Sequence, residues 1–327
     1  MNENMLRMAL VINTSHDNFI KNLSNILLYL LYNDGSPNQY TADELKDLVE
    51  KTIHLQLTFS EERKTMDKTK IDWCDSTWNP VTGCLHGCEY CYARSIASRF
   101  GCHAKAENDA EKIVYPWKDS ESGKILPYPF DFHPTFHRYR LNEYLNKKGR
   151  NIFVCSMADL FGDWVPDSWI EEVFAVCEAA PQHNYLFLTK NPKRYEKLLD
   201  RYMPPNMWFG WSQTGPIGAD FSFTTHHSVQ TFISIEPLLK PFKEYHIRGV
   251  DWVIIGAETG HRKDKVIPKR EWIESIVEQC KEVDIPVFMK SSLADIWGAP
   301  LMQEYPKQFN HENPANKSQA LFEKNVR

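Results

Sequence analysis

Three cysteines, Cys84, Cys88 and Cys91, lie close together in the stretch "GCLHGCEYC". Gly83 and Gly87 punctuate this stretch, and glycine permits the tight turns that would point the thiols toward one centre. Thiolates are ligands of zinc and of iron–sulfur clusters. The spacing therefore predicts a loop that holds a metal centre through three cysteines.

The number of cysteines limits which metal centre this can be. A structural zinc site needs four protein ligands, and no second Cys-x2-Cys pair occurs in the chain. A Cys3His zinc site using His86 or His103 stays open, as does a set of buried thiols without metal. Three thiolates suit a four-iron cluster, because they leave one iron free to bind a substrate or cofactor.

The elements that position this loop follow it in the sequence. Six short apolar runs after the loop lack polar alternation, which is typical of strands covered on both faces. They are Asn151–Met157, Tyr185–Thr189, Met207–Ser212, Thr231–Ile235, Asp251–Gly256 and Pro286–Met289. Amphipathic helices such as "VPDSWIEEVFAVCEAAP" separate several of them. The pattern predicts an α/β fold with about six parallel strands, either open or curled into a barrel.

Polar residues follow these runs at the points where the strands should end. They are Asp159, Lys190, Ser212, Gln213, Glu236, Glu258 and Lys290. Because the carboxyl ends of parallel strands share one rim, where ligands bind, we expect these side chains to form one site. Two other interpretations stay open: strands that end at the surface meet polar residues in any case, and Asp159 could cap the next helix.

The run "CLHGCEYC", with Tyr90 directly before the third cysteine, resembles the signature of radical S-adenosylmethionine (SAM) enzymes. The resemblance implies a partial (β/α) barrel, one 4Fe-4S cluster and bound SAM as cofactors. It also implies reductive cleavage of SAM to a 5′-deoxyadenosyl radical that abstracts hydrogen from a substrate. In such enzymes Tyr90 would lie beside the cluster, with a core aromatic as the alternative interpretation, and Ser156 and Asp159 would hold the methionine amino group. Lys190, Ser212, Gln213, Glu236 and Glu258 would contact SAM or the substrate.

The resemblance can be narrowed. The loop "NPVTGCLHGCEYCYAR" is similar to that of radical SAM proteins grouped with spore photoproduct lyase. From about Trp73 to Met289 the chain resembles a phage- and prophage-associated radical SAM family of unassigned function, through "TWNPVTGC", "FISIEPLL" and "DWVIIGAETG". The chain departs from that family in Gly215 to Gln230, which looks short and lacks the expected basic helix. These resemblances favour a nucleic-acid or nucleotide substrate, with a protein or peptide as the rival, and imply a dedicated partner protein encoded nearby.

Composition sets the remaining expectations. The chain has 327 residues, 42% of them hydrophobic, and a net charge of −5, so binding dominated by phosphate neutralisation is not supported. No apolar run is long enough to cross a membrane and no secretion signal stands out, which favours a cytoplasmic protein. The radical SAM resemblance implies a reductant such as flavodoxin or ferredoxin. We predict a helical N-terminal extension and linker over residues 1–70, the barrel over 71–300 and a C-terminal tail over 301–327. The alternative function is a non-catalytic, zinc-stabilised binding protein that uses the same cysteine loop.

Overall fold

A computed structural model describes residues 69–102, 113–199, 202–216, 229–242, 247, 249–260 and 262–309 of the chain. Most of the predicted N-terminal extension, His103 and residues 310–327 of the predicted tail lie outside the described residues. No helix in the described part is long and apolar enough to span a membrane.

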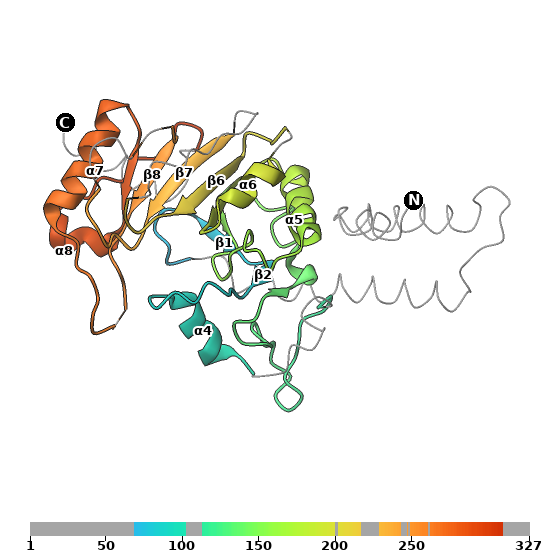
Figure 1. Cartoon of the computed structure of the whole chain (residues 1–327). Helices are drawn as coiled ribbons and strands as arrows, with labels where there is room; N and C mark the ends of the chain where they lie inside the picture. The colour runs from blue at the N-terminus through green and yellow to red at the C-terminus, as the bar shows by residue number, and fades with distance from the viewer. Residues whose placement is uncertain are drawn as a thin grey trace, which may run out of the picture.

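Seven parallel strands form one curled sheet, in the order β1-β4-β5-β6-β7-β8-β9 (Figure 1). They are β1 (Ser76–Trp78), β4 (Asn151–Val154), β5 (Asn184–Thr189), β6 (Met207–Ser212), β7 (Gln230–Ile235), β8 (Trp252–Ile255) and β9 (Val287–Met289). Six of them match the predicted apolar runs. The predicted partial barrel is therefore confirmed, with β1 as an additional strand that pairs with β4.

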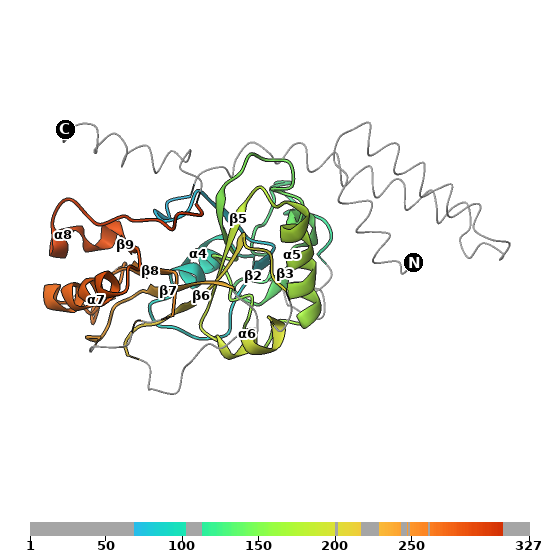
Figure 2. The same cartoon turned by 90° about the horizontal axis from the view of Figure 1, so that it is seen from above.

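Helices cover the outer face of this sheet. Figure 1 and Figure 2 show α5 (Asp167–Ala179) and α6 (Lys193–Leu198) near its first half and α7 (Arg270–Glu282) near its last strands. Phe174 of α5 packs against Phe187 and Phe209, and Ile273 of α7 belongs to the same buried cluster as Val253. Each such side chain contributes about 1.5–3 kcal/mol when it is fully buried. The remaining helical segments of the described residues are α4 (Tyr92–Phe100), α8 (Ala294–Trp297) and the 3-10 turns Arg138–Arg140 and Ser291–Leu293.

A second hydrophobic cluster fills the concave face of the sheet. Because side chains alternate along a strand, Phe232 and Trp252 point inward while Ile233 and Val253 point outward, which explains why the runs lack a regular alternation of apolar and polar residues. Trp73, which precedes β1, packs on Phe153, with ring centroids 4.7 Å apart. The inner face is thus a packed core below the rim.

Segments from both ends of the described chain complete this inner core. Asp72 accepts a hydrogen bond from the Ser291 amide at 2.8 Å, and the Trp252 indole donates to the Glu304 carbonyl at 2.9 Å. Phe309 is 1% exposed and lies in the same cluster as Trp252. Residues 301–309, placed in the C-terminal tail by the sequence prediction, therefore pack with the barrel.

The strand β2 (Val81–Thr82) directly precedes the cysteine loop and pairs antiparallel with β3 (Thr135–Phe136). The helix α4 (Tyr92–Phe100) follows that loop. The β2–β3 pair and α4 therefore hold the two ends of the cysteine loop at the rim of the sheet.

Candidate cluster and cofactor site

The cysteine loop is fixed to the barrel by backbone hydrogen bonds. The Gly83 amide donates to the Met157 carbonyl at 2.9 Å, and the Cys84 amide donates to the Phe132 carbonyl at 3.1 Å. Gly83 has φ +87°, and a Cβ there would lie 2.2 Å from the His133 carbonyl oxygen. Only glycine fits this position, because the backbones of residue 83 and His133 lie too close together to admit a side chain.

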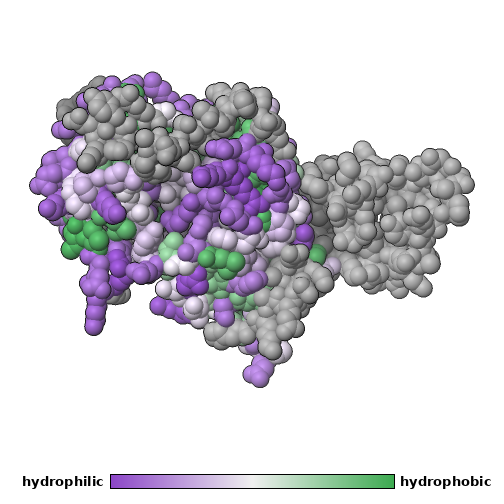
Figure 3. Space-filling view, in the orientation of Figure 1, coloured by the Kyte–Doolittle hydropathy of each residue, from purple (hydrophilic) through white to green (hydrophobic). Residues whose placement is uncertain are grey.

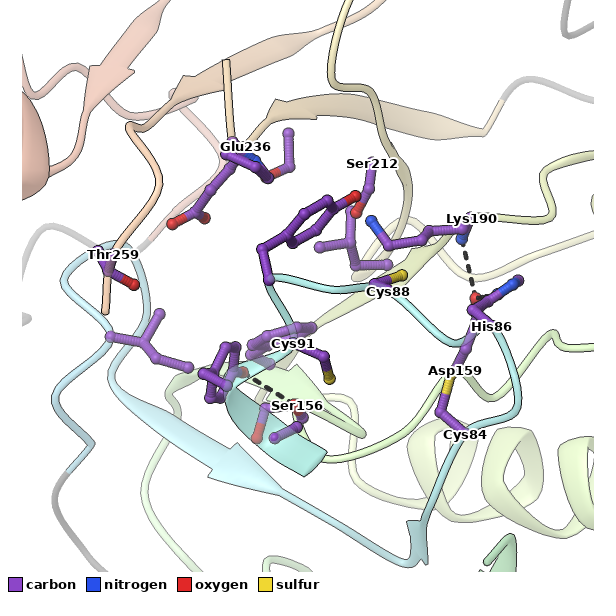
Figure 4. A pocket seen from close by; sticks show the side chains of 18 of the residues that line it. Cys84, His86, Cys88, Cys91, Ser156, Asp159, Lys190, Ser212, Glu236 and Thr259 are labelled. Atoms are coloured by element: carbon purple, nitrogen blue, oxygen red, sulfur yellow. Dashed lines mark hydrogen bonds and ion pairs between the residues drawn. The ribbon is translucent and has the colours of Figure 1, made fainter. Parts of the chain in front are cut away.

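The three thiols of the loop line one cavity. Cys84, Cys88 and Cys91 are free and half-buried, and all three border the same hollow (Figure 4). Cys91 is the N-cap of α4, where its Sγ accepts a hydrogen bond from the Arg94 amide at 3.4 Å. A helix N-terminus favours a thiolate, because its amides carry partial positive charge.

The remaining cysteines have other surroundings. Cys74, Cys155, Cys177 and Cys280 are buried, and Cys102 donates to the Pro129 carbonyl at 2.9 Å. None of these five lines the cavity. Cys74 and Cys102 therefore do not belong to the donor set of the cysteine loop.

The polar strand ends meet the cysteine loop in this cavity. The predicted residues that line it, besides the cysteines, are Tyr90, Ser156, Asp159, Lys190, Ser212, Glu236, Glu258 and Lys290. Figure 4 shows Glu236 on the opposite side of the cavity from Cys84 and His86. Gln213 is not among the lining residues: it follows Ser212 directly, and successive side chains of an extended chain point to opposite faces.

Asp159 connects three segments below the cavity. Its Oδ1 accepts from the Phe161 amide at 3.0 Å and from Thr189 Oγ1 at 2.7 Å, and its Oδ2 accepts from the Lys190 amide at 2.9 Å. His86 Nε2 lies 2.7 Å from the same Oδ2. The N-cap of the next helix, α5, is Pro166, so Asp159 does not cap that helix. Its carboxylate instead joins the ends of β4 and β5 to the cysteine loop.

Asn79 positions the segment that follows β4. Its Oδ1 accepts from the Met157 amide at 2.9 Å and from Ser156 Oγ at 3.2 Å. The Ser156 carbonyl accepts from the Tyr92 hydroxyl at 2.9 Å. The asparagine of the "NP" dipeptide thus places Ser156 at the cavity, a role that its position in the sequence does not reveal.

Two ion pairs lie at the ends of the later strands, and the second also reaches the cysteine loop, because Arg262 Nη1 lies 3.5 Å from Glu89 Oε2. Lys290 Nζ pairs with Glu236 Oε1, and a Cβ at Gly256 would lie 3.0 Å from the Lys290 side chain, so glycine leaves room for this pair. The Arg262 guanidinium donates two hydrogen bonds, of 2.7 and 2.8 Å, to the Glu258 carboxylate. The Arg262 guanidinium holds the pKa of the Glu258 carboxyl below its usual value. The sequence around Arg262 contains no recognisable motif. Its position four residues after Glu258 was the only feature that could have indicated this ion pair.

Burial raises the pKa of two groups in the cysteine loop, Cys84 and Tyr90. Burial, with a smaller contribution from Asp159, raises the pKa of the Cys84 thiol to about 11. Burial and the neighbouring Cys88 raise the pKa of Tyr90 to about 12. Tyr90 therefore keeps its proton at neutral pH, and Cys84 ionises only when a bound cation offsets the cost of its charge.

The donor set fits an iron–sulfur cluster better than a single ion. A zinc ion needs its ligands gathered around one point, at about 2.3 Å for sulfur. Among the described residues, no three histidine, cysteine, aspartate or glutamate side chains are grouped in that way. Three half-buried cysteines that border one cavity suit a cluster, in which each thiolate binds a different iron atom.

Comparisons with known proteins add a family and a set of distant structural likenesses. The family model of "Protein of unknown function (DUF5131)" matches residues 68–313. No curated protein matches the sequence. The matching solved structures include a cysteine-to-alanine mutant of spore photoproduct lyase, with a TM-score of 0.33 and 13% identity, covering 53% of this chain and 48% of that chain. This chain therefore spans about half the length of that protein.

Two further structures of the same enzyme match over more of their length. A tyrosine-to-phenylalanine mutant of spore photoproduct lyase has a TM-score of 0.41 and 10% identity, covering 69% of this chain and 78% of that one. Spore photoproduct lyase complexed with dinucleoside spore photoproduct has a TM-score of 0.36 and 10% identity, covering 79% and 75%. Likenesses at these values carry no functional argument, so function has to be inferred from the cavity itself.

Proposed function

We propose that this chain, which belongs to the DUF5131 family of proteins of unknown function, is a radical SAM enzyme. The observation that carries the proposal is that three free cysteines of one short loop and the polar ends of six parallel strands line a single cavity. Cys84, Cys88 and Cys91 would hold a 4Fe-4S cluster and leave one iron for SAM. When bound, the cluster supplies the electron that cleaves SAM to the 5′-deoxyadenosyl radical.

The chain's own residues bind and orient SAM in this proposal. Lys190 presents its ammonium to the cavity, with Nζ 5.5 Å from the centroid of the Tyr90 ring. No hydrogen bond or ion pair to this ammonium is found among the described residues, so it is available for the SAM carboxylate. The Ser156 hydroxyl is assigned to the amino group of SAM, and Ser212 and Glu236 to ribose hydroxyls or the substrate.

Asp159 does not bind SAM directly in this proposal. Its two oxygens already accept four hydrogen bonds, one of them through the short contact with His86. A carboxylate that is buried and satisfied in this way has little capacity left for an incoming ammonium. We therefore assign Asp159 to the positioning of the cysteine loop, and Tyr90 to the wall of the cavity beside Lys190.

Several expectations from the sequence remain part of the proposal. The substrate is a nucleic acid or nucleotide, in preference to a protein or peptide, and this preference rests on the resemblance of the cysteine loop. A cytoplasmic setting, a phage association, a flavodoxin- or ferredoxin-type reductant and a dedicated partner protein are proposed on the same basis.

Anaerobic reconstitution tests the function directly. The wild-type chain should bind about four irons and four sulfides, and should form 5′-deoxyadenosine from SAM with dithionite. Cys88→Ala should lose both properties, while the control Cys102→Ala, which changes a cysteine outside the cavity, should keep them. Stoichiometric zinc without SAM cleavage would instead support the alternative of a zinc-stabilised binding protein.

A further inference from the structure

The helix after the cysteine loop turns its large apolar side chains to solvent. Tyr92, Ile96 and Phe100 of α4 are 49%, 36% and 54% exposed, whereas Ala93 and Ala97 are its buried residues. Their spacing of four residues aligns the three along one side of the helix, and we call them the α4 strip. Figure 3 shows that the described surface on this side is mainly hydrophilic, with hydrophobic side chains gathered in a few small areas.

The α4 strip begins at the candidate cluster. Cys91 caps α4, and Tyr92 lines the cavity. At about 1.5 Å of rise per residue, Ile96 lies roughly 7 Å and Phe100 roughly 13 Å along the helix axis from Cys91. A protein seated on the α4 strip would therefore stand directly beside the cluster.

All charged side chains of α4 are positive. The helix carries Arg94 and Arg99 and has no carboxylate. Arg94 is held against the protein, with its Nη2 donating to the Cys84 carbonyl at 3.3 Å and its guanidinium 5.0 Å from the Phe132 ring centroid. Arg99 is exposed in the last turn of the helix. In a chain of net charge −5, this surface favours a partner with acidic groups around an apolar contact.

The proposed function requires an electron donor. A 4Fe-4S cluster must receive one electron before each cleavage of SAM, and the described residues offer no second group of cysteines that could store it. We propose that the α4 strip is the docking surface for an acidic protein that carries single electrons. The carrier is oxidised by one electron, the cluster is reduced by one electron, and no atom is transferred. This proposal rests on the radical SAM function. Docking of this kind needs only a small, transient interface.

The test compares a protein donor with a small one. Formation of 5′-deoxyadenosine from SAM is measured for the full, reconstituted chain, first with reduced flavodoxin and then with dithionite, which needs no docking surface. The double variant Ile96→Ser/Phe100→Ser should lower kcat/KM for flavodoxin by about tenfold, as expected for loss of central apolar contacts. Its rate with dithionite should stay unchanged. Val283→Ser, at an apolar residue that is 46% exposed and directly follows α7, is the matched control and should change neither rate.

A charge variant provides a second measurement that does not depend on the packing of α4. Arg99→Glu should lower the flavodoxin rate and weaken its dependence on salt, with the dithionite rate again unchanged. If the double variant loses iron, Arg99→Glu decides the question. Wild-type flavodoxin rates in both variants would overturn the proposal, as would a loss confined to turnover of a macromolecular substrate. A wild-type chain that forms no deoxyadenosine with dithionite would instead reject the radical SAM function, and the docking proposal with it.

Discussion

His86 and Asp159 lie 73 positions apart in the sequence, yet His86 Nε2 and Asp159 Oδ2 are 2.7 Å apart. His86 belongs to the cysteine loop, between Cys84 and Cys88, and its ring also packs edge-on against Trp164, with centroids 4.8 Å apart. The contact ties the loop to a buried carboxylate that in turn joins the ends of β4 and β5. Since ligands are held in place by such outer contacts, the pair should determine how well the cysteines retain a cluster.

Replacing His86 tests this relationship. His86→Ala should lower cluster affinity by about tenfold or more, the usual cost of losing a group that orients a ligand. His86→Gln keeps an N–H donor of similar reach and should restore most of the affinity. Iron content and visible absorbance, measured after gel filtration, report the effect. Equal iron retention in His86→Ala and the wild type would contradict the positioning role.

The glycines of the cysteine loop should differ sharply in their tolerance of a methyl group. Gly83→Ala forces a Cβ to 2.2 Å from the His133 carbonyl oxygen, whereas a Cβ at Gly87 meets nothing within 4 Å. Both residues have positive φ, which costs about 1–2 kcal/mol for alanine. Gly87→Ala should therefore lose about that much stability, and Gly83→Ala clearly more. Urea unfolding of the two apoproteins measures both losses of stability. Equal losses would show that the loop backbone moves to accommodate the added methyl group at residue 83.

The pH dependence of stability should reveal the pair formed by Glu258 and Arg262. Because Arg262 lowers the pKa of Glu258 in the folded chain, the pair stabilises the fold at pH values above the unfolded pKa. This contribution disappears as pH falls through the lowered folded pKa. Arg262→Met should thus be less stable than the wild type at neutral pH, and the gap should close below about pH 4.

Denaturant unfolding at several pH values measures that gap. Arg270→Met is a suitable control, because Arg270 forms an exposed pair with Glu274 at 2.8 Å, and exposed pairs contribute little. A difference between Arg262→Met and the wild type that stays constant with pH would mean that the effect of Arg262 is packing rather than charge.

The strands could be predicted because their inner and outer faces are both buried. In β7, Phe232 packs in the concave core and Ile233 packs under the helices, so apolar residues occupy both faces of the strand. β1 could not be found in this way. It has three residues, two of them Ser76 and Thr77, and it is a strand because it pairs with β4. Pairing between distant segments leaves no periodic signal in either one.

The site shows the same division. The sequence pattern alone predicted that Lys190, Ser212, Glu236 and Glu258 lie together, because the carboxyl ends of parallel strands share one rim. All four line the cavity. Gln213 falls outside the cavity because its side chain points to the face opposite that of Ser212. The contact of His86 with Asp159 was not predictable from the sequence, because it depends on how two distant loops fold against each other.

Binding of SAM should depend on Lys190 through the carboxylate of SAM. The ammonium faces the cavity above the Tyr90 ring, and hydrogen bonds between charged groups are worth about 1.5–3 kcal/mol. Lys190→Met keeps the length of the side chain but removes its charge, and should weaken SAM binding roughly tenfold to a hundredfold. Methylthioadenosine has the same nucleoside without the methionine carboxylate, so its affinity should be equal for wild type and variant. Equilibrium dialysis of both ligands separates the possibilities: if both affinities fall together, Lys190 shapes the cavity or contacts the nucleoside, and the carboxylate of SAM is held by another group.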